Sequence, residues 1–261
     1  MVYVGTPGPD ILDLREWQHS VDFAIASEKD PVYLRELKGN ARKFGWDRRY
    51  VSTTMAVGSL ISQQTEEAEQ LFEQAPDWPT IVNYDVYAHP VRANLERFDR
   101  NVGIWAEISS FLKASQDEAP EIVLLLTANV RGKGTYCDSA IRSIVEETRK
   151  YGITISQEDS DRFLTCSMAK KTQICIPYWL TRNGATASGF RLEVLDSIAY
   201  PGTGGKAMFH LALRFRSNPV DSEMPEIPLL HLLNFGHRVV GESDGRFVGR
   251  IEVTPAIGPA R

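Results

Sequence analysis

Hydrophobic positions along the chain recur with a helical spacing in three segments. Residues 90–114 carry an apolar side chain every three or four positions, which predicts a long amphipathic helix. Residues 138–152 repeat this spacing after Asp138, a residue type that caps helix starts. A shorter apolar stripe follows a Pro-Asp pair and predicts a third helix within residues 9–25. Residues 63–77 are polar and acidic without a lasting stripe, which fits a solvated helix or a loop.

Other segments show alternating or continuous apolar residues, as strands do. The sharpest case is residues 206–216, in which four apolar side chains point to one face. Those side chains are Phe209, Leu211, Leu213 and Phe215. The remaining predicted strands are residues 32–37, 48–61, 81–87, 121–130, 171–182, 189–198 and 246–255. Because strands and helices do not alternate regularly, the order favours an α+β fold with a twisted, mostly antiparallel sheet and packed helices.

Length and composition suit one large globular domain. The chain has 261 residues, of which 43% are hydrophobic and 24% charged, so it can bury a sizeable core. Residues 217–228 are rich in proline and read as a linker. The sequence therefore predicts a domain over residues 1–217 and a C-terminal segment over residues 218–261 that can act as a regulatory lid.

Charge and cysteine usage limit the compartment and the partners. The net charge is −5 and the isoelectric point is about 5.6, which argues against wholesale nucleic-acid binding. No apolar stretch approaches the roughly 18 residues of a membrane-spanning helix, and the first ten residues lack the features of a secretory signal. The three cysteines form no CxxC pair, which favours free thiols over disulfides or zinc. A cytoplasmic protein is expected.

Signatures of catalysis are missing from the sequence. There is no GxGxxG, Walker A, HExxH or GxSxG motif. Residues 201–206, PGTGGK, come nearest to a phosphate loop, but a strand follows them and a tight turn explains them better. The five histidines show no spacing typical of zinc ligands. The sequence thus predicts a protein that is not an enzyme and holds neither cofactor nor metal.

One basic segment stands out in this acidic chain. Residues 38–49 carry about +4, and Phe44 and Trp46 lie among the charges. The basic residues are Lys38, Arg42, Lys43, Arg48 and Arg49, opposed by Asp47 alone. We expect them at the tip of a hairpin formed by the strands at 32–37 and 48–61. The two aromatic residues either fold back onto the core or belong to a surface that meets an acidic partner, which would be RNA or an anionic membrane.

A second segment alternates over the length that a membrane hairpin needs. Residues 171–182 and 189–198 each place apolar side chains on one face, at about the 9–11 residues of a membrane β-strand. These side chains are Ile174, Ile176, Tyr178, Leu180, Phe190, Leu192 and Val194. Half-buried strands of an ordinary two-layer core alternate in the same way, so the pattern alone leaves both readings open.

Three blocks in order resemble the pore-forming domain of gasdermins. Tyr33 and Tyr50 frame the basic Phe44-Gly-Trp46 step as in that family, and the helix at 90–114 precedes the strand EIVLLLTANV. The block KKTQICIP at 170–177, followed by GFRLEVL, is similar to the family's second membrane hairpin. The resemblance spans roughly residues 20–200. The short chain is most similar to bacterial gasdermins and to fungal regulators of cell death that act in allorecognition.

The resemblance implies a pore-forming cell-death effector with a gasdermin-like fold. Such a protein binds acidic phospholipids (cardiolipin or phosphoinositides) and no nucleic acid. It assembles into a ring with itself or with a related variant, and it inserts β-hairpins into the plasma membrane or another cellular membrane. The implied lipid-binding residues are Lys38, Arg42, Lys43, Arg48, Arg49, Lys170 and Lys171, with Phe44 and Trp46 at the membrane interface and the seven alternating residues above in the membrane hairpin. The alternative is a soluble binding module, for RNA or a protein partner, that does not insert.

Overall fold

The computed structural model describes most of the first half of the chain and separate stretches of the second half. The described residues are 1–8, 10–63, 65–86, 104–129, 135–150, 156–165, 171, 174–177, 180, 189–201, 207–217, 238–243 and 246–252.

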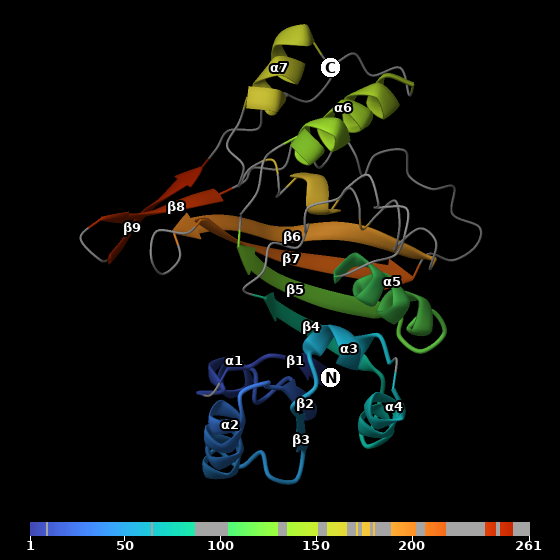
Figure 1. Cartoon of the computed structure of the whole chain (residues 1–261), viewed down its shortest axis with the longest axis vertical. Coiled ribbons are helices and arrows are strands. Elements are labelled where there is room, and N and C mark those ends of the chain that lie inside the picture. The colour runs from blue at the N-terminus through green and yellow to red at the C-terminus, as the bar shows by residue number, and fades with distance from the viewer. Residues whose placement is uncertain are drawn as a thin grey trace.

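A single sheet runs through these residues (Figure 1). It has nine strands in the order β3-β2-β1-β4-β5-β7-β6-β8-β9. β1 to β5 are mutually parallel, β7 lies antiparallel between β5 and β6, and β8 is parallel to β6 while β9 returns antiparallel. The strands are β1 (Val2–Gly5), β2 (Phe23–Ser27), β3 (Tyr50–Thr53), β4 (Pro79–Val86), β5 (Glu121–Asn129), β6 (Phe190–Pro201), β7 (Ala207–Ser217), β8 (Arg238–Ser243) and β9 (Arg246–Glu252).

Helices pack on both faces of the parallel half of the sheet. α1 and α2 lie on one side of β1 to β3, and α3 and α4 lie on the other (Figure 1). The helices of the described residues are α1 (Leu12–Glu16), α2 (Pro31–Lys43), α3 (Val57–Ile61), α4 (Glu66–Glu73), α5 (Ile104–Ala114), α6 (Thr135–Lys150) and α7 (Gln157–Thr165).

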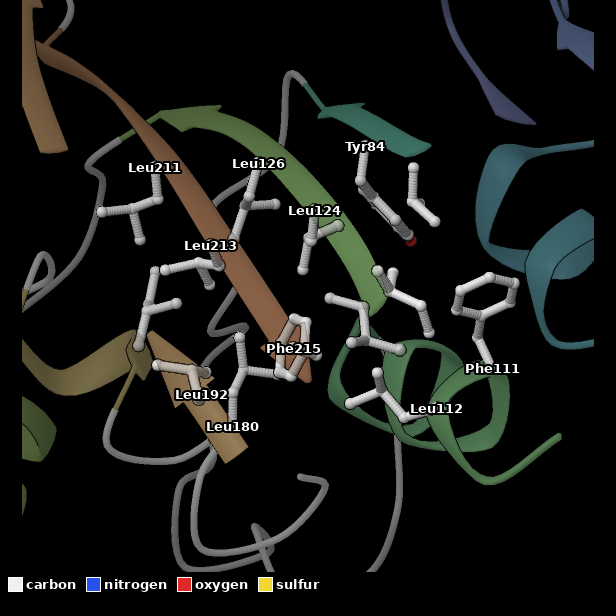
Figure 2. Close-up of a cluster of buried hydrophobic side chains, with 14 of the residues drawn as sticks. Tyr84, Phe111, Leu112, Leu124, Leu126, Leu180, Leu192, Leu211, Leu213 and Phe215 are labelled. Atoms are coloured by element: carbon white, nitrogen blue, oxygen red, sulfur yellow. The ribbon is translucent and has the colours of Figure 1, made fainter. Parts of the chain in front are cut away.

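Each face of the sheet therefore has its own hydrophobic core. Successive strand residues point to opposite faces, so Tyr3 of β1 packs with α1 and α2 while Val4 packs with α3 and its neighbours. The smaller core, beneath α1 and α2, contains Leu37 and Trp46. The larger core continues along β5, β7 and β6 to α5 and α6, and Figure 2 shows Leu124 and Leu126 of β5 on the same side of the sheet as Leu213 and Phe215 of β7.

α2 replaces a strand that the sequence predicts at residues 32–37. Asp30 caps the helix because its side chain accepts a hydrogen bond of 2.7 Å from the Val32 N–H, and Pro31 occupies the first helical position. Three residues at helical spacing face the smaller core: Leu34, Leu37 and Ala41. The prediction was wrong because its alternating apolar positions also fit a helix of spacing three and four.

Two further strand predictions differ from the structure. The segment 48–61 splits into the short strand β3 and the helix α3, separated by Thr54, Met55 and Ala56. In segment 171–182, the described residues Lys171, Ile174–Pro177 and Leu180 are helical. No hairpin forms around the basic segment, because α2 and β3 flank it rather than two antiparallel strands.

Several predictions from periodicity are confirmed. The segments at 81–87, 121–130, 189–198, 206–216 and 246–255 overlap β4, β5, β6, β7 and β9. The segment at 138–152 overlaps α6, which begins three residues earlier, and α4 lies within the polar stretch at 63–77. The helix predicted at 90–114 is present as α5 from Ile104, while residues 87–103 lie outside the described residues. Ser217, the first residue of the predicted linker at 217–228, ends β7, and residues 218–228 lie outside the described residues. The division after residue 217 stays a prediction, and β8 and β9 join the main sheet.

The fold class needs a correction. The expected mixture of helices with one sheet is present, but the first five strands of the sheet are parallel rather than antiparallel. Between β1 and β3, each strand is followed by a helix, and such crossovers bring the next strand back in parallel. The chain has a Rossmann-like, doubly wound α/β architecture, and its likeness to gasdermins does not hold.

Candidate functional site

The strand order defines one place where a ligand is expected. From β1 the chain crosses through α1 to β2 on one face, whereas β4 on the other side of β1 is reached through α3 and α4 on the opposite face. β1 and β4 therefore flank the switch point of the sheet, and ligands of doubly wound folds bind outside the carboxyl ends of the strands there. The residues at those ends are Gly5, Glu28, Thr53, Asn83 and Asp85.

The loop after β1 is tied closely to β4. A Cβ atom on Gly5 would lie 2.3 Å from the Asn83 carbonyl oxygen, so only glycine lets the two strands approach in this way. The Thr6 N–H donates a hydrogen bond of 3.2 Å to the same carbonyl, and the Thr6 hydroxyl accepts one of 3.3 Å from the Asp85 N–H. Gly8 has a φ of +70° and open space where a side chain would stand. The loop thus has a fixed base and an open outer turn.

Carboxylates gather beside this loop. The Asn83 side-chain amide donates a hydrogen bond of 2.8 Å to Asp13 of α1. Burial raises the pKa of the Asp13 carboxyl, and the hydrogen bond from Asn83 offsets part of that rise. The pKa of Asp85 is also raised, first by burial and then by the negative charge of Asp13. The edge at β1 and β4 is therefore acidic and favours cationic or neutral groups.

A buried tyrosine lies under the two carboxylates. Tyr3 is fully buried, and its hydroxyl makes no well-formed hydrogen bond among the described residues. Burial raises the pKa of Tyr3 well above its ordinary value, and the charges of Asp13 and Asp85 add to that rise. Tyr3 therefore stays protonated and keeps a hydroxyl proton beneath the acidic edge.

Hydrogen bonds also organise the ends of β2 and β3. One carboxylate oxygen of Glu28 accepts a bond of 2.8 Å from the Asp30 N–H, which directs this half-buried side chain at the start of α2. The Glu28 N–H donates to the Thr53 carbonyl at 3.0 Å, and the Thr53 hydroxyl donates to Glu67 of α4 at 3.1 Å. The carboxyl ends of the neighbouring strands are held in register, with Glu28 between them.

On the opposite face of β4, a side chain of α5 holds the strand in place. The Tyr84 hydroxyl donates a short hydrogen bond to the Glu107 carboxylate. That carboxylate packs against Gly58 of α3 so closely that a Cβ atom there would lie 2.0 Å from it. Because Tyr84 stands between Asn83 and Asp85, this contact fixes the backbone that carries both polar residues.

A polar row continues across the sheet from β4. Asp85 is the register partner of Thr127 on β5, and Thr127 is the partner of His210 on β7. The Thr127 hydroxyl and His210 Nδ1 are hydrogen bonded at 2.8 Å. Burial lowers the pKa of His210, so its imidazole is neutral at physiological pH. The row offers hydrogen-bonding groups beside the acidic edge.

The aromatic residues assigned to a membrane interface lie inside the protein instead. Trp46 is 0% exposed in the smaller core, with the Arg49 guanidinium 4.2 Å from the centre of its ring. Phe44 is partly buried, with Arg15 at 4.3 Å and Lys43 at 5.4 Å from its ring centre. The turn after α2 folds them back onto the core, which was the other reading of this segment.

The remaining residues of the membrane assignment are scattered. Lys171 is 8% exposed and forms an ion pair of 2.6 Å with Asp138 of α6 rather than facing a lipid surface. The apolar residues Ile174, Ile176 and Leu180 are buried in helical segments, while Phe190, Leu192 and Val194 face the larger core from β6. Lys170 and Tyr178 lie outside the described residues. Lys38, Arg42, Lys43 and Arg48 are exposed, and Arg49 is half-buried.

The sequence did carry signals for the site that periodicity missed. The short apolar run at 2–4 ends in Gly5, and a second run at 23–26 is followed by Glu28 and by the Asp30-Pro31 helix start. A strand ending in glycine and a second strand ending in an acid, with helices after each, is the order expected of a nucleoside-binding βαβ unit. Because the loop after the first strand departs from GxGxxG, a search for that motif does not find this βαβ unit.

Comparisons with known proteins give distant structural likenesses. TYW2 of P. horikoshii in complex with MeSAdo aligns over 83% of this chain and 57% of its own, at 14% identity and a TM-score of 0.39. TYW2 of M. jannaschii in complex with AdoMet aligns over 83% and 68%, at 12% identity and 0.39. The 23S rRNA methyltransferase ErmE aligns over 85% and 64%, at 13% identity and 0.40. The chain thus spans less than two thirds of two of these proteins. No family model and no curated protein matches the sequence.

These findings correct the expectations that rested on the gasdermin resemblance. The pore-forming, cell-death and allorecognition assignments are wrong, because they rest on a gasdermin-like antiparallel sheet, whereas β1 to β5 are parallel and doubly wound. The expectations of acidic phospholipids and of ring assembly without nucleic acid depend on the same gasdermin-like fold and are withdrawn with it, as is the expectation of no enzymatic activity. Among the described residues, no helix has the length and apolarity to cross a membrane.

Proposed function

We propose that the chain binds S-adenosylmethionine (AdoMet) at the carboxyl ends of β1 to β4 and is a methyltransferase. The observation that carries the proposal is the acidic, proline-containing edge at the switch point of the sheet. This edge suits an adenosyl ligand with a positive charge and disfavours a ligand with phosphates.

Glu28 supports the binding of a ribose. It lies at the end of β2, 23 positions after Gly5 at the end of β1. In doubly wound folds, an acidic residue about 20 positions after the glycine loop accepts hydrogen bonds from ribose hydroxyls. Because one Glu28 oxygen already accepts the Asp30 N–H, the side chain is oriented before any ligand arrives.

The loop after β1 argues against a dinucleotide. Pyrophosphate groups need backbone N–H donors at a glycine-rich loop and a helix start. Here Pro7 and Pro9 lack an N–H, and the helix that follows has only five residues. Asp13 and Asp85 would repel phosphates at this place.

The same groups suit the charged end of AdoMet. Its sulfonium and α-amino group are both positive, so carboxylates at the edge of β1 and β4 attract them. When bound, AdoMet supplies a methyl group that leaves sulfur as the acceptor's lone pair forms the new bond. Asn83 and Asp85 lie at the end of β4 that faces this region, and the row through Thr127 to His210 offers hydrogen bonds to an acceptor.

Ligand binding to the full chain tests the proposal. Isothermal titration with AdoMet, S-adenosylhomocysteine and NAD should show binding of the first two only. Glu28→Ala should weaken AdoMet binding by about 10- to 100-fold, since hydrogen bonds to charged groups contribute about 1.5–3 kcal/mol. Glu36→Ala on the exposed face of α2 is the matched control and should leave binding unchanged.

Two outcomes would refute the proposal. One is binding of NAD in place of AdoMet, which would make the chain a dinucleotide protein. The other is AdoMet binding that Glu28→Ala leaves intact, which would move the ligand away from the end of β2. Transfer itself is followed with AdoMet labelled at the methyl group and separated pools of RNA, protein and small molecules as acceptors.

A further inference from the structure

We propose that the basic face of α2 binds the phosphodiester backbone of a nucleic acid. The basic face consists of Arg35, Lys38, Arg42 and Lys43 of α2 and of Arg48 in the turn between α2 and β3, all exposed. It lies at the outer surface of the parallel half of the sheet and is separate from the groups assigned to AdoMet. The inference therefore does not depend on the proposed reaction.

Helical spacing gathers three of these charges into one stripe. Arg35, Lys38 and Arg42 stand three and four positions apart, so they follow each other along one side of α2. Like charges at these spacings destabilise a helix by about 0.2–0.5 kcal/mol per pair. None of the five basic residues forms an ion pair with a carboxylate in the described part of the chain. The repulsion among these charges is therefore not compensated within the described part of the chain, although a single change of Lys38 to Glu would relieve it.

The concentration of charge is large for this chain. Residues 35–49 contain six basic and two acidic residues, a net charge of +4. The whole chain carries −5, so all other residues together carry −9. A local positive surface on an otherwise negative protein attracts anionic partners to one face only.

The shape of the basic face favours a chain of phosphates over a membrane. From Arg35 to Arg42 the helix rises about 10 Å, so the stripe fits a partner with repeated charges rather than one small anion. Arginine guanidinium groups bind phosphate oxygens with two parallel hydrogen bonds. Trp46, which would be the strongest membrane anchor in this segment, is fully buried beneath this face, and the exposed aromatic residue of α2, Tyr33, stands at the start of the helix before the stripe.

The position of α2 connects the two surfaces. The helix begins at Pro31, three residues after Glu28, so the stripe starts beside the carboxyl end of β2. A nucleic acid held along α2 therefore passes one end of the candidate AdoMet site. The basic face supplies affinity without reading sequence, as phosphate contacts do.

Salt-dependent binding tests the inference directly. Fluorescence anisotropy of labelled single-stranded RNA, titrated with the full chain between about 50 and 200 mM salt, gives the slope of log K against log salt. With five neutralised phosphates the slope should be about −3.5 on a single strand. Replacing three of the cations (Lys38→Ala, Arg42→Ala, Lys43→Ala) should reduce its magnitude by about 2 and raise Kd about 100-fold near 0.1 M salt.

The control changes the same number of charges elsewhere. Lys113→Ala, Arg142→Ala and Arg191→Ala remove three exposed cations outside the basic face, and this variant should keep the wild-type slope. Alanine is a strong helix former, and circular dichroism checks that the helix remains. A second triple variant with glutamine at positions 38, 42 and 43 separates loss of charge from loss of side-chain length.

Three results would overturn the inference. The first is a wild-type chain that binds neither single-stranded nor duplex RNA. The second is a salt slope that the control variant changes as much as the α2 variant does. The third is binding to phosphatidylcholine vesicles containing phosphatidylserine in the absence of any RNA binding, which would assign the face to a lipid surface.

Discussion

Replacing Trp46 distinguishes a core residue from a surface anchor. The indole ring is fully buried in the smaller core and stacks under the Arg49 guanidinium. Truncation of such a side chain costs about 3–5 kcal/mol of stability, and this range includes about 0.5–1 kcal/mol for the lost contact with Arg49. Trp46→Ala should therefore lower the free energy of unfolding by about 4 kcal/mol.

A second substitution at the same position sharpens this prediction. The Trp46 indole N–H is buried without a hydrogen-bond partner among the described residues, and an unpaired buried donor costs about 1–3 kcal/mol. Trp46→Phe removes that donor and keeps most of the ring, so the loss of packing and the relief of the donor oppose each other. The net change should stay within about 1 kcal/mol.

Urea unfolding followed by circular dichroism measures both variants. Tyr33→Ala is the matched control, because Tyr33 is an aromatic residue of α2 that is 49% exposed, and it should change stability by no more than about 0.5 kcal/mol. A Trp46→Ala variant as stable as the wild type would refute the reasoning. That result would mean that the ring is not part of the core, and the packing of the turn after α2 would have to be redrawn.

Three further predictions concern α3, α2 and the acidic edge. Gly58→Ala should cost no more than about 2 kcal/mol in thermal unfolding, because the new methyl group displaces the flexible Glu107 carboxylate from the Tyr84 hydroxyl, while the higher helix propensity of alanine offsets about 1 kcal/mol. A loss well above that would contradict this balance. Asp30→Ala should cost about 1 kcal/mol in urea unfolding through loss of the α2 cap, with Asp30→Asn close to the wild type as its control. The fold raises the pKa of Asp13 and Asp85, so the folded state binds the protons of these carboxyls more tightly than the unfolded state does. The free energy of unfolding therefore falls as the pH rises from the ordinary carboxyl pKa of 3.8 through the raised pKa. Asp85→Asn should flatten that fall in unfolding measured across pH, and a fall of unchanged steepness would show that Asp85 does not contribute to it.

The sequence predicted those strands and helices that are buried on one face only, and also the fully buried strand β5. In β6 and β7, apolar residues alternate with charged residues such as Arg191 and Arg214, and one face meets the larger core. A half-buried strand leaves this pattern because its two faces meet different surroundings. The continuous apolar run of β5 and the stripe of α6 were equally readable.

Parallel pairing could not be read in the same way. β1 and β2 have four and five residues and are almost wholly buried, so they show no alternation. Which strand lies beside which depends on crossovers that connect distant residues, and no local pattern records that. Asp30-Pro31 is a helix start, but the apolar positions that follow it also fit an alternating strand.

The candidate site was missed for a chemical reason. A search for phosphate loops requires glycines and backbone N–H donors, whereas Pro7 and Pro9 occupy this loop. Glu28 is far in the sequence from Asn83 and Asp85, and only the parallel order of β2, β1 and β4 brings their strands to one edge. The sequence shows the basic segment, but the secondary structure predicted for it was wrong. The charges predicted at the tip of a hairpin lie mainly on a face of α2.

The arginines that precede β3 also affect how the open edge of the sheet behaves. β3 ends the sheet on its parallel side, so its outer backbone groups have no strand partner in the described sheet. Open edges of this kind invite pairing with a second chain, and short strands flanked by positive charge resist it. β3 has only four residues, and Arg48 and Arg49 precede it directly. Arg49 is half-buried against Trp46, so Arg48 is the exposed charge at this edge, and a variant that neutralises Arg48 should be more prone to aggregation in concentrated solution.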